Sequence, residues 1–147
     1  MEHIKRFGEL NNIKYKVVYD EDRYEINAYV DDKEIGNIVC EVIFNIDYEL
    51  GDDFTNDEID EMFPEQTVVK IEHISIEDEY KGVGIAKKLM KKMLYLMKKN
   101  GFNQFYLNAS PMGFGGLRTN SLVEFYKKFD FKVLLDQGHN VLMYLIY

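Results

Sequence analysis

The sequence predicts an α+β fold, in which helices pack on a central, twisted and mostly antiparallel mixed sheet of about seven strands. Segments rich in Val, Ile and Tyr, separated by short polar turns, fill the first third of the chain and its C-terminal end, and this composition is typical of strands. Between them, apolar residues recur every four positions, which is the spacing of an amphipathic helix. The length of 147 residues and the apolar fraction of 46% fit a single domain over residues 1–147.

The first half of the chain is expected to be an antiparallel meander followed by a short helix. Thr55 and Glu58 have the spacing of a capping box, which predicts a helix from there to about Phe63, just before Pro64. The expected strands are 13–19, 23–30, 34–46 and, mostly buried, 67–76, with acidic hairpin turns at 20–22 and 31–33.

The second half is expected to alternate helices with strands. A helix from about Val83 should end near the stop signal Asn100–Gly101, and its buried face holds Ile85, Leu89, Met93 and Met97. Ser121 and Glu124 suggest a second capping box and a second helix. The remaining elements are a strand at 102–109, a glycine-containing loop at 110–118, and a hairpin of strands 131–135 and 141–147 around the turn 136–140.

Net charge and cysteine content restrict the function classes. The formal net charge of −8 argues against nucleic-acid binding, which depends on neutralising phosphates. Cys40 is the only cysteine, which excludes an intramolecular disulfide and a cysteine-based metal cluster, and no metal site is predicted. No stretch approaches about 18 uncharged apolar residues, so we expect a soluble, cytoplasmic protein that does not bind membranes.

The charges are unevenly placed along the chain. Residues 47–61 contain eight acids and no base, whereas residues 81–99 contain seven lysines and no acid. Such asymmetry suits a molecule that binds a cation at one place and an anion at another. The alternative is that both segments are solvated faces that keep the protein soluble.

The run from Tyr80 to Ala86 joins an expected strand to the lysine-rich helix. Small residues there allow a tight turn in which several backbone N–H groups and the helix N-terminus face one anion. A dinucleotide fingerprint does not fit, because it needs a small residue where this chain has Lys87. A Walker-type loop does not fit either, because no Gly-Lys-Ser/Thr triplet follows.

A third phosphate-binding motif does fit. Lys81-x-x-Gly84-x-Ala86, after a strand and at the start of a helix, resembles the pyrophosphate-binding signature of the GNAT superfamily of N-acetyltransferases, with Lys81 in place of the usual Gln or Arg. Downstream, Tyr126 and Phe131 resemble the family's Tyr-x-x-x-Gly-Phe motif, with Asp130 in place of glycine. The resemblance extends from about Val68 to the C-terminus, and it implies the mixed GNAT sheet.

The resemblance implies that acetyl-CoA is the co-substrate. Its pyrophosphate would lie on backbone N–H groups at the helix N-terminus, and its pantetheine arm would lie beside the preceding strand. Asn120 is a further candidate, because the family's asparagine falls one residue away, at Thr119. The implied cofactor-binding residues are Ile74, Ser75, Ile76, Lys81, Gly82, Val83, Gly84, Ile85, Ala86, Lys87 and Asn120.

Two residues are implied as catalytic. An alkylammonium has a pKa of about 10.4 and must lose a proton before it can attack. Glu72 and His73 cannot both face the site, because strand side chains alternate. The resemblance favours Glu72 over His73, since related enzymes place a base on the face that Lys70 and Glu72 would share. Two alternatives stay open: Glu72 as the cross-strand partner of a lysine, and a water chain as the base. Tyr126 matches the family's general acid, against the alternative of a core aromatic residue.

The implied function is acetyl transfer to a primary amine by direct attack in a ternary complex. The alternative is a non-catalytic module of the same fold that binds coenzyme A or a protein partner. Family members usually carry two helices between their first two strands. These helices are missing here, because the segment from Tyr19 to Arg23 that joins the first two expected strands is too short to hold them.

The acceptor must then be bound by other elements, for which 47–61 and 111–118 are the candidates. The acidic segment would suit a cationic small molecule, such as a polyamine or an aminoglycoside, or a lysine side chain. The oligomeric state is left open, with 141–147 as a candidate edge strand for pairing.

Overall fold

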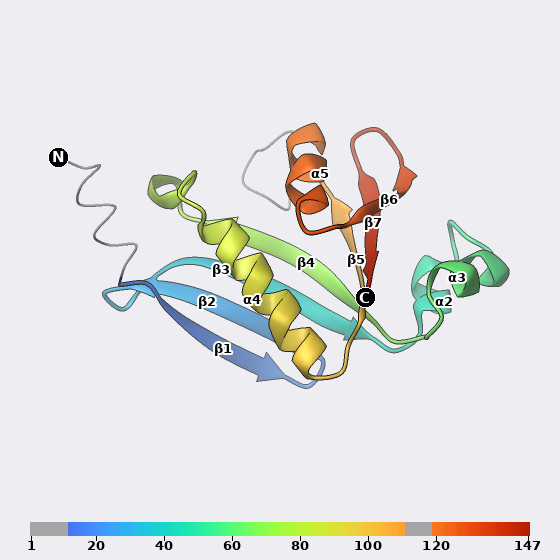
Figure 1. Cartoon of the computed structure of the whole chain (residues 1–147), viewed down its shortest axis with the longest axis horizontal. Helices are drawn as coiled ribbons and strands as arrows, with labels where there is room; N and C mark the ends of the chain where they lie inside the picture. Colours follow the sequence, from blue (N-terminus) through green and yellow to red (C-terminus); the bar gives the residue numbers. More distant parts are fainter. Residues whose placement is uncertain (1–11, 111–118) are drawn as a thin grey trace.

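The computed structural model describes residues 12–110 and 119–147, which form a seven-stranded mixed sheet with helices packed on it (Figure 1). The strand order is β1-β2-β3-β4-β5-β7-β6, and all neighbours are antiparallel except β4 and β5. The strands are β1 (Lys14–Asp20), β2 (Arg23–Val30), β3 (Lys33–Ile43), β4 (Val68–Ile76), β5 (Gln104–Ala109), β6 (Lys132–Asp136) and β7 (Val141–Ile146). The helices are α2 (Ile46–Leu50), α3 (Asn56–Met62), α4 (Ile85–Lys99) and α5 (Thr119–Lys127), with a 3-10 turn η1 (Asp78–Tyr80).

The meander and the first capping box are confirmed. β1 and β2 are joined by a tight hairpin, so no helix lies between them. Before α3, Thr55 accepts a hydrogen bond from the Glu58 N–H, while the Glu58 side chain accepts one from the Thr55 N–H. These two bonds satisfy N–H groups that have no partner inside the helix.

Three expectations about the elements were wrong. β3 ends at Ile43 and α2 follows it, because the Asn45 side chain caps a new helix by accepting the Tyr48 N–H. Ser121 lies inside α5 and does not cap it, since α5 begins at Thr119. β7 is not an edge strand, because β6 folds back against its outer side and leaves β1 and β6 at the edges.

The main core lies between α4 and one face of the sheet. α4 lies over β2, β3 and β4 (Figure 1), and it buries the apolar stripe expected from the four-residue spacing. Within this core the Cys40 thiol donates a hydrogen bond to Met93 Sδ, 3.4 Å away. Of the helices in the described ranges, none combines the length and apolar character that crossing a bilayer requires.

A smaller core lies on the opposite face. There α2 and α3 place Ile46, Leu50, Ile59 and Phe63 against Val68, Tyr106 and Tyr144. The helices α2 and α3 cover only one end of this face (Figure 1). The acidic segment 47–61 is therefore anchored by an apolar stripe and exposes most of its carboxylates to solvent.

The Cys40 thiol should be unreactive in the folded protein. Burial, together with the nearby Glu72 charge, raises its pKa to about 12, so the thiolate fraction at pH 8 is lower than that of a free cysteine by about three orders of magnitude. We expect a disulfide reagent to titrate no thiol in the native protein and one in denaturant. Rapid native labelling would contradict this buried position.

Candidate functional site

The sheet opens between its two parallel strands. β4 and β5 pair only at Val69–Phe105, Lys70–Tyr106 and Ile71–Leu107, and beyond these pairs the strands diverge toward the side where α5 lies (Figure 1). In the described part of the chain, β4 after Ile71 has a strand neighbour only on the β3 side. Backbone groups of residues 74–76 can therefore pair with an extended ligand on the side that faces β5.

A β-bulge marks the point of divergence. Val39 on β3 pairs with His73, but the next residue, Cys40, pairs with Ile71. Glu72 is the extra residue, immediately after the last pair with β5. Strict alternation of side chains between Glu72 and His73 was therefore a wrong assumption, because the bulge interrupts the two-residue period.

Beyond β4 the chain makes the glycine turn that the sequence predicts. Gly82 and Gly84 have φ values of 79° and 90°, in a region that glycine adopts without steric cost. Gly84 is the N-cap of α4 and has no side chain to satisfy the first N–H groups of the helix. These N–H groups and the helix dipole are thus available to an anion.

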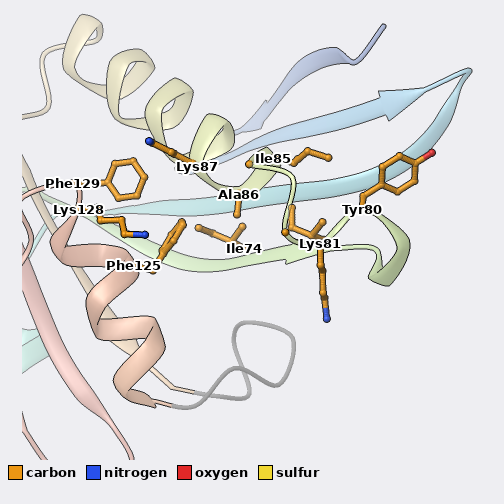
Figure 2. Close-up of a pocket in the computed structure, with 12 residues that line it drawn as sticks. Ile74, Tyr80, Lys81, Ile85, Ala86, Lys87, Phe125, Lys128 and Phe129 are labelled. Atoms are coloured by element: carbon orange, nitrogen blue, oxygen red, sulfur yellow. The ribbon is translucent and has the colours of Figure 1, made fainter. Parts of the chain in front are cut away.

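A cavity of about 420 Å³ lies beside this turn (Figure 2). One wall comes from β4 and the first turn of α4, while Phe125 from α5 and Lys128 and Phe129 from the turn after α5 reach toward the cavity. Three lysines lie on its rim: Lys87 in α4, Lys81 just before α4 and Lys128 just after α5. An anionic ligand would therefore meet positive charge from two sides. The complete lining is Ile74, Ile76, Tyr80, Lys81, Gly82, Gly84, Ile85, Ala86, Lys87, Phe125, Lys128 and Phe129.

Most of the predicted cofactor-binding residues meet at this cavity. Those that line it are Ile74, Ile76, Lys81, Gly82, Gly84, Ile85, Ala86 and Lys87. Ser75 is exposed outside it, and Val83 packs against the main core. Asn120 lines a neighbouring hollow of about 450 Å³, which shares Phe125 and Lys128 with the cavity.

Sequence reasoning missed the wall that α5 contributes. Phe125 and Phe129 are four positions apart, and their rings make an edge contact with a centroid distance of 5.3 Å. Ser121 and Glu124 predicted a helix here, but no side chain of it was predicted to meet a ligand. The available signal was Lys128, which follows α5 directly and lies next to Phe129 in the chain.

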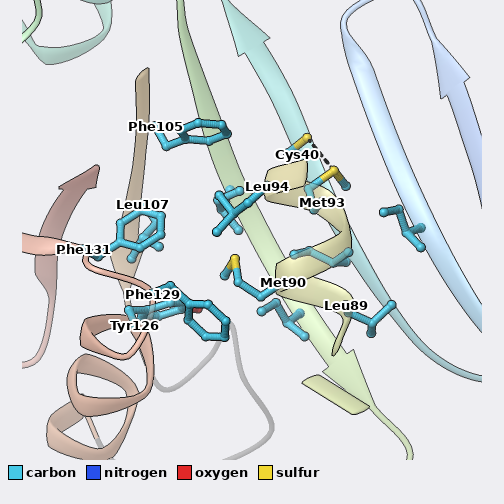
Figure 3. Close-up of a cluster of buried hydrophobic side chains, with 14 of the residues drawn as sticks. Cys40, Leu89, Met90, Met93, Leu94, Phe105, Leu107, Tyr126, Phe129 and Phe131 are labelled. Atoms are coloured by element: carbon cyan, nitrogen blue, oxygen red, sulfur yellow. Dashed lines mark hydrogen bonds between the residues drawn. The ribbon is translucent and has the colours of Figure 1, made fainter. Parts of the chain in front are cut away.

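Tyr126 lies behind the cavity wall. The residue is 5% exposed in the main core, near Phe131 (Figure 3). Its ring centroid lies 6.0 Å from that of Phe131 and 5.4 Å from that of Phe125. Burial raises the pKa of its hydroxyl to about 12. The hydroxyl is therefore protonated at neutral pH, as that of an ordinary tyrosine is, and it is a weaker acid than an ordinary tyrosine.

Charged groups gather on the sheet face opposite α4. Glu49 Oε1 accepts a hydrogen bond from the Tyr106 hydroxyl at 2.6 Å and forms an ion pair with Lys70 at 3.2 Å. The Tyr106 hydrogen bond, with Lys70 adding to it, lowers the pKa of Glu49. Lys70 thus forms its closest ion pair with Glu49. This argues against Glu72 as the cross-strand partner of a lysine.

The Glu72 carboxyl lies next to this cluster and has the opposite shift. Burial is the main cause of its raised pKa, and the neighbouring Glu41 carboxyl adds to it. Lys70 and Arg23 act in the other direction but do not cancel the increase. A carboxylate with a raised pKa is a better base than an ordinary glutamate.

We expect two variants to shift the Glu72 titration in opposite directions. Lys70→Met removes a charge that favours the carboxylate, so the pKa of Glu72 should rise further. Glu41→Gln removes a repulsive neighbour, so the pKa should fall. Carbon-13 NMR titration of the glutamate carboxyls measures both shifts. If Glu72 titrated identically in the two variants and the wild type, Lys70 and Glu41 would not be the neighbours that set its pKa.

Known proteins resemble this chain along most of its length. The profile of the Acetyltransferase (GNAT) family matches residues 3–131. No curated sequence is similar enough to this chain to be matched to it.

Three solved structures illustrate the likeness in fold. A GNAT family acetyltransferase from Elizabethkingia anophelis with acetyl-CoA bound has 10% identity and a TM-score of 0.63, over 93% of this chain and 99% of that one. Arabidopsis thaliana NAA60 with acetyl-CoA has 20% identity and a TM-score of 0.59, over 99% and 89%. PaiA N-acetyltransferase from Thermoplasma acidophilum, solved with coenzyme A, has 21% identity and a TM-score of 0.60 over 86% of this chain, which spans 62% of the Thermoplasma protein.

Proposed function

Because the chain belongs to the GNAT acetyltransferase family, we propose that it transfers the acetyl group of acetyl-CoA to a primary amine, by direct attack in a ternary complex. The observation that carries this proposal is the cavity between β4, the glycine turn and α5. It combines an uncapped helix N-terminus, three lysines and an open strand edge. A diphosphate joined to an extended amide-containing arm needs these three features.

The donor would bind along the cavity in the proposed complex. Backbone N–H groups from Gly82 to Lys87 would hold the pyrophosphate, and the lysines on the rim would add charge. The pantetheine arm would pair with the free edge of residues 74–76. The thioester would then lie near the bulge, where a backbone N–H can polarise its carbonyl.

Glu72 would prepare the amine in this mechanism. Its carboxylate, at the bulge, accepts a proton from the ammonium group, directly or through a water molecule, and leaves a nitrogen lone pair free. The nitrogen then attacks the thioester carbonyl carbon to give a tetrahedral intermediate, which becomes the amide as the C–S bond breaks. Tyr126 would donate its hydroxyl proton to the departing sulfur, whose conjugate acid has a pKa of about 8.5. The proton that the nitrogen must lose on becoming an amide would pass through water to the Tyr126 oxygen and restore its hydroxyl.

The acceptor is proposed to be cationic. The exposed carboxylates of 47–61 lie on α2, on α3 and in the turn between them, and α2 also supplies Glu49 to the cluster beside Glu72. A polyamine, an aminoglycoside or a lysine side chain would complement this charge. The other predicted acceptor element, 111–118, lies outside the described residues.

A screen of amines tests the proposal. The protein is incubated with acetyl-CoA and polyamines, aminoglycosides or lysine peptides, and intact-mass spectrometry looks for a gain of one acetyl group. Thiol titration measures the amount of coenzyme A released, and this amount should equal the amount of acetylated amine. Micromolar coenzyme A binding without acetylation of any amine would favour the non-catalytic module instead.

A further inference from the structure

The strand β1 lies at one edge of the sheet that the described residues form. It is first in the strand order and, among the strands of the described residues, it pairs only with β2. Val17 and Val18 are each 50% exposed, and Tyr19 is 71% exposed. An edge strand presents unpaired N–H and C=O groups, to which another strand can add.

The two ends of β1 carry charges of opposite sign. Lys14 and Lys16 lie in its first half, and Asp20 is its last residue. Lys14 and Asp20 are six positions apart, so both side chains point to the same face of the sheet. A second β1 in antiparallel orientation would bring each lysine end to an aspartate end, whereas parallel pairing would align like charges.

We propose that the open edge of β1 binds β1 of a second copy of this chain. The two strands pair antiparallel about a two-fold axis at Val17, so that the two sheets become one continuous sheet. Lys14 then lies opposite Asp20 at both ends, and Tyr15 lies opposite Tyr19. Opposite charges and aromatic pairs directly across strands are both stabilising.

The length of β1 favours pairing centred on Val17 over pairing centred on Val18. Pairing about Val17 uses every residue from Lys14 to Asp20. Pairing about Val18 would place Lys16 opposite Asp20 and push Lys14 beyond the partner's strand. There the chain has already entered the hairpin turn, since Glu21 has a φ of 52°, and no ladder can continue.

The proposed interface is separate from the cavity. β2 and β3 lie between β1 and β4, and the axis runs perpendicular to the sheet. Both copies of α4 therefore lie on the same face, and both cavities stay open. A contact through one short strand is small, so we expect a dissociation constant in the micromolar range.

Charge-reversal variants test the proposal by sedimentation velocity over a wide concentration range. Wild-type protein should shift toward a dimer as its concentration rises. Lys14→Asp and Asp20→Lys each create two like-charge pairs, so each alone should dimerise at least tenfold more weakly. An equimolar mixture of the two variants restores both pairs and should recover the dimer.

Controls make the result specific to β1. Lys132→Asp makes the same charge change on β6, at the other sheet edge, and should leave dimerisation unchanged. Thermal unfolding of each variant excludes a loss of fold as the cause. A wild-type protein that stays monomeric, a dimer that neither variant weakens, or a mixture that fails to recover would each overturn the proposal.

Discussion

Tyr126→Phe is expected to lower kcat for amine acetylation by about 100-fold, within the range that a positioned general acid supplies. The ring remains, so packing against Phe125 and Phe131 is kept. Among the described residues the Tyr126 hydroxyl has no hydrogen-bond partner, so its loss should not weaken the fold. The affinity for acetyl-CoA should stay within about twofold.

The split between kcat and KM separates catalysis from packing. Loss of the proton donor should lower kcat and leave the KM for acetyl-CoA near its wild-type value, whereas a packing defect would also raise that KM. Tyr24→Phe, on β2 and stacked on Tyr19, is the matched control. Equal activity of Tyr126→Phe and wild type would remove Tyr126 from the mechanism.

The glycine turn could be predicted because its cause is local. Only glycine adopts the positive φ of Gly82 and Gly84 freely, and the apolar period of α4 begins directly after them. Spacing alone then distinguished this turn from two other phosphate-binding motifs. The same holds for α3, where Thr55 and Glu58 satisfy each other's backbone N–H groups.

The bulge at Glu72 could not be predicted because its cause is not local. Residues 67–76 read as one regular strand, and the extra residue becomes evident only when β3 and β5 are in place. The same limit applies to Tyr106 and Glu49, which meet across 57 positions. Strand order also depends on pairing between distant segments, which explains why the sequence offered β7 as a candidate edge strand.

A carboxylate placed inside the cavity should abolish donor binding. Ala86 lines the cavity in the first turn of α4, where Ala86→Glu would fill space and repel a diphosphate. We expect the dissociation constant for acetyl-CoA to rise at least 100-fold, which corresponds to about 2.7 kcal/mol, as measured by calorimetric titration. An acid in the first turn of a helix is favourable, so the helix should be retained.

Tyr95→Glu is the matched control, because it adds the same charge to the exposed side of the same helix, where Tyr95 is 69% exposed. This variant should bind acetyl-CoA as the wild type does. If Ala86→Glu also kept wild-type affinity while remaining folded, the glycine turn would not be where the donor binds. If both variants lost affinity equally, net charge would be the cause, and the cavity would lose its role. Loss in Ala86→Glu alone places the diphosphate at the N-terminus of α4, where backbone N–H groups lack partners in the helix.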